Sequence, residues 1–212
     1  MKKAIVALAI AAFASNAFAV IAGGSHDLTR LAGAQLSSCQ FCHTPHGANN
    51  TTGTSTNVQY DYSLHPLWNR MQPTATYTFY TSVVDQTITV GAGSFACLSC
   101  HDGASDMGQT FKGTRGFAAT TRMAAGSFAN LTTTLTNDHP VGVTFVPGGT
   151  YNTIAAVTQA GLKLYTANNV ECGSCHDPHG ASDGATGSGP TGLASFLRVS
   201  STTICTVCHS GK

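Results

Sequence analysis

The sequence is short of charged residues. Only 9% of its 212 residues are Asp, Glu, Lys or Arg, and the formal net charge is +1. A nucleic-acid-binding surface needs clustered basic side chains, which this composition does not supply, so nucleic acid is not an expected partner. Trp68 is the only tryptophan, and glycine, alanine, serine and threonine are abundant. Because small side chains each bury little apolar area, we expect something other than side chains to organise the interior.

Long apolar runs are also missing after residue 19. A membrane-spanning helix needs about 20 apolar residues, and no later segment provides them. The early run at 4–14 follows two lysines and precedes a small-residue cleavage site, "AFA", at 17–19. This pattern predicts a secretory signal peptide over 1–19 and a mature chain from Val20. The alternative, an anchoring helix, needs a longer run. We therefore expect an exported protein without a membrane span.

No cysteine lies outside one repeated pattern. The eight cysteines form four CxxC pairs, each followed at once by a histidine. Four disulfides are the usual interpretation of such a count in an exported chain, but they give the four histidines no role. Structural zinc needs a second ligand pair for each ion and does not explain a histidine at the next position. Clusters of the ferredoxin type need longer cysteine runs.

Covalent c-type haem accounts for every residue of the pattern. Two thiols form thioethers to one edge of the porphyrin, and the next residue then lies beneath the iron as its proximal ligand. We therefore predict four haems c. The attachment residues are Cys39, Cys42, Cys97, Cys100, Cys172, Cys175, Cys205 and Cys208. The proximal ligands are His43, His101, His176 and His209.

The remaining histidines are candidates for the distal iron ligands. They are His26, His46, His65, His139 and His179. Four irons with two histidines each need four of them, so one is surplus. The thioether alternatives, Met71, Met107 and Met123, do not recur in a repeated context. His46 and His179 lie three residues after a proximal histidine, too close to reach round to the other face of the same haem. Each must reach a neighbouring haem, so adjacent haems are expected to lie close together.

The four motifs form an internal repeat. A long motif with an extra histidine, then a short motif without one, occurs twice and predicts two duplicated two-haem modules, at about 20–115 and 116–212. Strands are expected at 75–84, 87–90 and 141–146, and short helices at 153–165 and before the motifs. Tyr77 and Phe79 should share one face of the first strand. Segments such as "GANNTTGTSTN" are typical of loops. The expected fold is mostly irregular coil, with short helices and a few short β-strands, wrapped around four covalently bound haems.

Several segments together resemble a known family. They are "CHTPHGA", "PLWNR", "CLSCHDG", "NDHPVG", "CGSCHDPHG" and "FLRVSSTTICTVCH", in that order. They resemble the multihaem c-type cytochromes with paired CxxCH motifs, and most nearly the tetrahaem cytochromes of the outer-membrane cytochrome E type, which polymerise into extracellular "nanowire" filaments. In such filaments a histidine of one subunit can complete a haem of the next. His26, in a family-like "HDL" near the mature N-terminus, is the expected donor. The family often has histidine after "PLWN", where this chain has Arg70, and His65 lies just upstream.

Together these features predict an electron-transfer protein without catalytic residues. It would conduct electrons through a chain of bis-histidine haems, as a head-to-tail homopolymer at the cell surface, to partner cytochromes or external acceptors. One alternative is a monomeric periplasmic shuttle. Another is a multihaem reductase, which needs an open iron position. The haem propionates are expected to pair with arginines, which are Arg30, Arg70, Arg115, Arg122 and Arg198.

Overall fold

The computed structural model describes residues 21, 24–30, 37–55, 58–65, 67–80, 88–112, 121–179 and 196–211. Over these residues the chain is mostly irregular, with short helices and two two-stranded antiparallel sheets. No helix in this part of the chain is long and apolar enough to cross a membrane. The expected signal peptide and Arg115 lie outside the described residues. The wrapping of the chain around haems stays a prediction.

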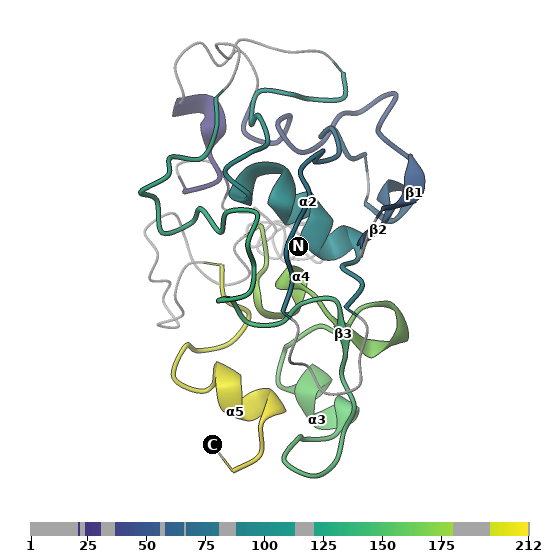
Figure 1. Ribbon diagram of the computed structural model, residues 1–212, viewed down its shortest axis with the longest axis vertical. Coiled ribbons are helices and arrows are strands. Elements are labelled where there is room, and N and C mark those ends of the chain that lie inside the picture. Colours follow the sequence, from purple (N-terminus) through teal and green to yellow (C-terminus); the bar gives the residue numbers. More distant parts are fainter. Residues whose placement is uncertain are drawn as a thin grey trace, which may run out of the picture.

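Helix α2 (Ala92–His101) organises one half of the molecule, the upper half in Figure 1. Its Phe95 and Leu98, three residues apart and therefore on one helix face, are both buried. The hairpin of β1 (Thr52–Ser55) and β2 (Val58–Asp61) lies beside it. The hairpin falls partly within a segment expected to be a loop, because its polar sequence lacks the apolar alternation that indicates a strand. Two 3-10 turns complete this half, η1 (Leu28–Arg30) and η2 (Tyr62–Leu64).

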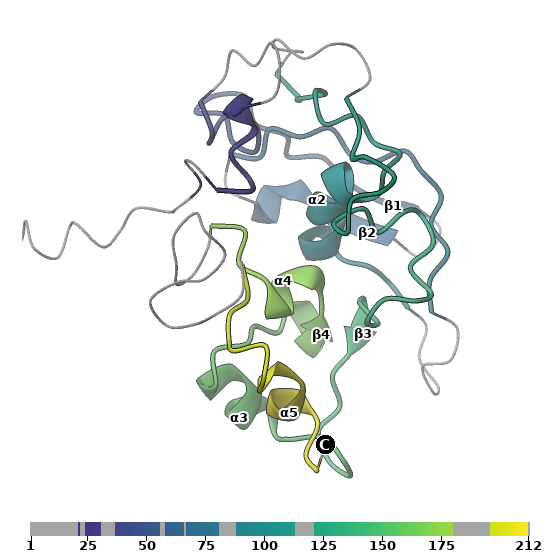
Figure 2. The ribbon, with the colours of Figure 1, turned by 90° about the vertical axis from the view of Figure 1, so that its left-hand side faces the viewer.

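The other half contains the remaining short elements. They are β3 (Val143–Thr144), α3 (Ile154–Gln159), η3 (Thr166–Asn168), β4 (Asn169–Val170), α4 (Cys172–Cys175) and α5 (Ile204–Cys208). Strands β3 and β4 pair antiparallel. In both ribbon views α4 lies between α2 above and α5 below (Figures 1 and 2). The first helix expected here, at 153–165, is shorter than predicted. Thr153 caps its start, and the chain leaves the helix at Gly161, whose φ is +104°.

Two separate apolar clusters correspond to these halves. The first contains Tyr62, Tyr77, Phe79, Ile88, Val90, Phe95, Leu98 and Leu135. The second contains Phe145, Val157 and Leu162, with Ile204 and Val207 against them. Leu131, Val141 and Val143 pack on the first cluster, so residues 131–143 pack against the first half, although β3 pairs with β4 of the other half. The module boundary near 115 stays a prediction, but the division between the clusters lies close to residue 144.

The expected strand at 75–84 shows the predicted alternation without forming a ladder. Tyr77 and Phe79 are buried and Thr76 and Thr78 are exposed. The only bridge of the described part of this segment joins Thr78 to Thr134, and residues 81–84 lie outside the description. Side-chain alternation follows from extended backbone alone, whereas a ladder needs a partner strand in register.

A glycine holds the expected strand segments 87–90 and 141–146 together. Residues 88–90 form no strand, but Thr89 donates its N–H to the carbonyl of Gly142 at 3.0 Å. Gly142 has a φ of +73°, and a Cβ there would lie 2.7 Å from the backbone of Thr89 and Val90. Only glycine fits this close approach. Of the segment 141–146, only β3 is a strand.

Candidate functional site

The four CxxCH motifs take two kinds of backbone structure. Motif 2 (97–101) is the last part of α2, motif 3 (172–176) begins with α4, and motif 4 (205–209) lies within and just after α5. Motif 1 (39–43) is a run of turns. In the three helical motifs the two thiols are three residues apart and therefore project from one side of the helix. None of the eight cysteines forms a disulfide.

Thiols of consecutive motifs are near neighbours. Burial, and then the thiol of Cys100, raise the pKa of Cys42 to about 11. The pKa of Cys97 is raised by its hydrogen bond with Cys172 and by burial. Burial and then the thiol of Cys208 raise the pKa of Cys175 to about 11. Motif 1 is therefore beside motif 2, motif 2 beside motif 3, and motif 3 beside motif 4, a row in sequence order.

Three motifs are held by the same backbone arrangement. A three-residue segment, here called a strap, lies against each of motifs 1, 3 and 4; the straps are 67–69, 196–198 and 150–152. The residue after each motif histidine donates its N–H to the first strap carbonyl at 2.7 Å, and the third strap N–H donates to the second cysteine's carbonyl at 2.8 or 2.9 Å. The middle strap residue forms a β-bridge with the motif histidine. The straps therefore fix the backbone on both sides of each expected proximal ligand.

The third strap residue also reaches into the motif loop with its side chain. Asn69 Nδ2 donates to the carbonyl of Gln40 at 2.8 Å, Arg198 Nε to that of Gly173 at 2.8 Å, and Asn152 Nδ2 to that of Thr206 at 2.9 Å. In each case the acceptor is the first residue between the two cysteines. Sequence reasoning missed Asn69 and Asn152 and gave Arg198 a different partner. The available signal was an apolar or aromatic residue before Asn or Arg, in "LWN", "TYN" and "FLR".

A buried carboxylate joins motifs 2 and 3. Glu171, the sequence's only glutamate, is 2% exposed and accepts hydrogen bonds from the N–H of Gly91 at 2.9 Å and from the Ser94 hydroxyl. The same hydroxyl accepts from the N–H of Cys172 at 2.8 Å. Glu171 also forms a capping box with Ser174 at the start of α4. This cluster locks the N-terminal ends of α2 and α4 together.

The burial of Glu171 predicts a pH-dependent contribution to stability. Burial raises the pKa of this carboxyl above its usual 4.5, although the bonds from Ser94 and Gly91 oppose the rise. The protonated form is then favoured in the folded state, so the stabilisation is complete below about pH 4.5 and is lost as the pH rises through the folded pKa. We expect Glu171→Gln to remove this loss. Urea unfolding at pH 4 and pH 7 measures the change in the free energy of unfolding between the two pH values. The same change in the native protein and in the Gln variant would contradict the assignment.

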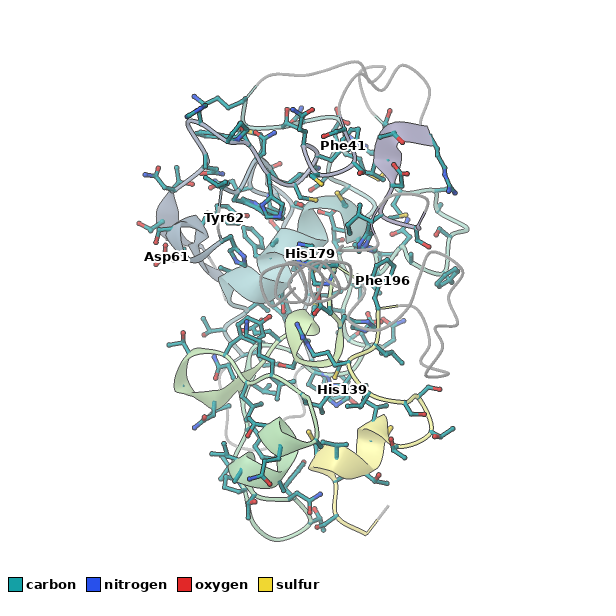
Figure 3. All side chains as sticks on the ribbon, turned by 180° about the vertical axis from the view of Figure 1, so that it is seen from behind. Phe41, Asp61, Tyr62, His139, His179 and Phe196 are labelled. Carbon is teal, nitrogen blue, oxygen red and sulfur yellow. The ribbon has the colours of Figure 1, made fainter. Side chains whose placement is uncertain are left out.

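The histidines form three ring pairs. Centroids lie 6.1 Å apart for His26 and His101, 6.0 Å for His43 and His179, and 6.5 Å for His139 and His209. The interplanar angles are 71°, 18° and 70° in the same order. Each pair joins one expected proximal ligand to one distal candidate. Figure 3 places His179 near the middle of the molecule and His139 in its lower half, next to α5.

The Nδ1 atoms of four of these histidines lie near carbonyl or carboxylate oxygens. The Nδ1 atoms of His26, His101 and His139 lie 3.0, 2.8 and 3.0 Å from the carbonyl oxygens of Pro178, Ala129 and Pro140. His179 Nδ1 is 3.6 Å from an oxygen of Asp177. A carbonyl or carboxylate at Nδ1 is the usual partner of a metal-ligating histidine, because it leaves Nε2 for the metal. Burial lowers the pKa of His26, which favours the neutral ring that can bind a metal.

Three histidines are outside these pairs. No histidine ring packs against His176, although all nine histidines are among the described residues. His46 is exposed at an open cleft of about 340 Å³, whose other lining residues include His43, Asn69 and Lys112. His65 is half-buried and packs against Tyr62 and Trp68, with ring centroids 6.1 and 5.5 Å away.

The paired histidines fit an iron held between two imidazoles. Nitrogens about 2 Å from one metal ion on opposite sides place the ring centroids about 6 Å apart. The described residues contain no group of three or more His, Cys, Asp or Glu side chains converging on one point. The arrangement is one of pairs with two thiols beside each motif histidine, which matches the donor set of a c-type haem.

Comparison with known proteins adds no family assignment. No protein-family model matches the chain, and no curated protein matches its sequence.

Proposed function

We propose that this chain is an exported tetrahaem c-type cytochrome that conducts electrons through a row of closely spaced haems. The observation that supports it most is the set of three histidine pairs, each with centroids 6.0 to 6.5 Å apart and each including one CxxCH histidine. When bound, the haems would supply one-electron redox chemistry at iron. Paired imidazoles leave no open position for a substrate, which suits electron transfer rather than bond chemistry.

The ligand sets follow from the pairs and the repeat. His179 would serve motif 1, His26 motif 2 and His139 motif 4. Because motifs 1 and 3 are near-copies and the extra histidine of motif 3 reaches motif 1, we assign the extra histidine of motif 1, His46, to the His176 of motif 3. His65 is then the surplus histidine, which is consistent with its packing against Tyr62 and Trp68.

The row of motifs supports conduction along the chain. Cys42 and Cys100, Cys97 and Cys172, and Cys175 and Cys208 are near neighbours, so each attachment site has the next one beside it. Electrons would enter at one end of this row and leave at the other. The physiological carriers at the ends would be partner cytochromes or external acceptors, as the family resemblance implies.

We further propose that the chain assembles head to tail into an extracellular filament. Large apolar side chains are exposed, notably Phe128, fully exposed, and Val146, 60% exposed, and few charges oppose self-association. A head-to-tail contact that does not close on itself gives a fibre. The cross-subunit role expected for His26 stays a prediction. In this structure His26 lies beside His101 of its own chain.

Electron microscopy of protein sheared from the host's surface, with mass spectrometry and visible spectra of the same sample, tests these proposals. We expect filaments, four covalent haems per chain and only low-spin bands. Dissociated subunits distinguish the two roles of His26: they stay fully low-spin if His26 binds its own chain, and gain one high-spin haem if it binds a neighbour. Discrete single subunits would favour the periplasmic shuttle, and a chain without haem would overturn the function.

The reductase alternative has one observation in its favour. His176 is exposed and none of the histidine pairs of the described residues includes it, so an iron bound there is the one where an open position would lie. A high-spin band in the native protein that cyanide converts to low-spin would support this alternative over the conduit.

A further inference from the structure

Arg70 is the most deeply buried cation among the described residues. It is 2% exposed and directly follows the strap that holds motif 1. Its Nη2 donates to the carbonyl of Ser99 at 2.9 Å and to that of Asp106 at 3.1 Å, and its Nη1 donates to the carbonyl of Met107. The sequence led us to expect a propionate partner for Arg70. Its guanidinium instead donates to one carbonyl of motif 2 and to two carbonyls just after that motif.

The charge of Arg70 is held by neutral groups. A guanidinium stays protonated in proteins, and no carboxylate of the described chain forms an ion pair with it. Asp102, one turn beyond Ser99, accepts instead from the Tyr77 hydroxyl at 2.7 Å and from nearby N–H and hydroxyl groups. Asp106 contacts Arg70 through its carbonyl, while its carboxylate accepts from the N–H of Gly108. The positive charge is therefore stabilised by dipoles and not neutralised.

This charge lies between two haem attachment sites. Ser99, its acceptor, directly precedes Cys100 of motif 2, and Asn69, its neighbour in the chain, donates its N–H to the carbonyl of Cys42 of motif 1 at 2.8 Å. Motif 4 lies in the other half of the molecule (Figure 2).

We propose that Arg70 is an electrostatic tuning residue that raises the reduction potentials of the haems at motifs 1 and 2. The inference rests on the proposed function. Reduction removes one positive charge from an iron centre, so a fixed cation nearby favours the reduced form. In a buried site this effect is screened little by water or salt. Electrons would then reside preferentially at the end of the row that contains motifs 1 and 2, which gives the conduit a polarity.

The test compares Arg70→Gln with Arg70→Lys by spectroelectrochemical titration of the full haem-loaded protein. Two of the four haems of the Gln variant should become about tenfold harder to reduce at a fixed ambient potential, a downward shift of about 59 mV for one electron. The Lys variant, which keeps the charge, should shift much less. Covalent haem count and low-spin bands should be unchanged in both.

The controls separate charge from packing and from failure of the proposed function. Equal shifts in the Gln and Lys variants would show that packing matters and would overturn the inference, as would unchanged potentials in the Gln variant. If neither variant folds, the native protein decides: NMR-assigned potentials should be higher at motifs 1 and 2 than at motif 4, and the reverse order contradicts the proposal. A native protein without haem would instead refute the proposed function.

Discussion

Alanine at both Cys97 and Cys100 is expected to give a chain with three covalent haems in place of four. The physical reason is that these thiols are the only attachment points at motif 2, and the thioethers cannot form without them. Intact-protein mass spectrometry measures the haem count.

Ser99→Ala is the matched control for this variant. It changes the same loop but keeps both thiols, and the carbonyl that accepts from Arg70 remains. We expect four haems in the control. A double-alanine chain that still carries four haems would contradict the attachment scheme. A native chain that carries no haem, and whose mass is lower than that of the reduced chain by the lost thiol hydrogens, would indicate disulfides instead.

His179→Ala is expected to convert one of the four haems from low-spin to high-spin. In this structure His179 faces His43 with ring centroids 6.0 Å apart and an interplanar angle of 18°. Removing the imidazole leaves that iron with one protein ligand and with an axial position that is open or occupied by water. The irons of the other pairs keep both of their histidine ligands. Electron paramagnetic resonance at low temperature, together with visible spectra, measures the fraction of high-spin haem.

The surplus histidine provides the control for His179. His65→Ala should leave all haems low-spin, because its ring packs against the rings of Tyr62 and Trp68, which also contact each other. His46→Ala should give one high-spin haem if His46 completes motif 3. A high-spin haem in the His65 variant, with none in the His46 variant, would reverse these two assignments. Low-spin spectra for the His179 variant would contradict the assignment of His43 and His179 to one haem.

Elements with a strong local signal were predicted more reliably than elements that depend on partners. The shared face of Tyr77 and Phe79 follows from extended backbone alone, and both side chains are buried even though the expected strand forms no ladder. The β1–β2 hairpin was missed because "TGTS" has no apolar alternation, and its pairing depends on register with β2. The α3 helix was predicted too long because the periodic pattern continues past Gly161, where the backbone turns to positive φ.

In the candidate site, too, local features were predictable from the sequence, whereas contacts between distant residues were not. The CxxCH motifs are local, since two thiols and one imidazole within five residues contain the whole of the proposed attachment chemistry, and the sequence sufficed to identify them as candidates. The straps could not be found in this way, because Asn69, Asn152 and Arg198 are far in sequence from at least part of what they contact. Arg70 was assigned to propionates from its charge alone, whereas in the folded chain it donates to one carbonyl of motif 2 and to two carbonyls just after that motif.

The sequence by itself determined the set of candidate ligands, since eight cysteines and nine histidines in this spacing leave little freedom for other chemistry. Only the tertiary structure decided which histidine faces which motif. A ring pair such as His43 and His179 joins residues more than a hundred positions apart, and nothing in local spacing encodes that contact. The same holds for the row of motifs and for the buried charge of Arg70. Proximity and burial are properties of the folded chain, whereas ligand chemistry is a property of the residues.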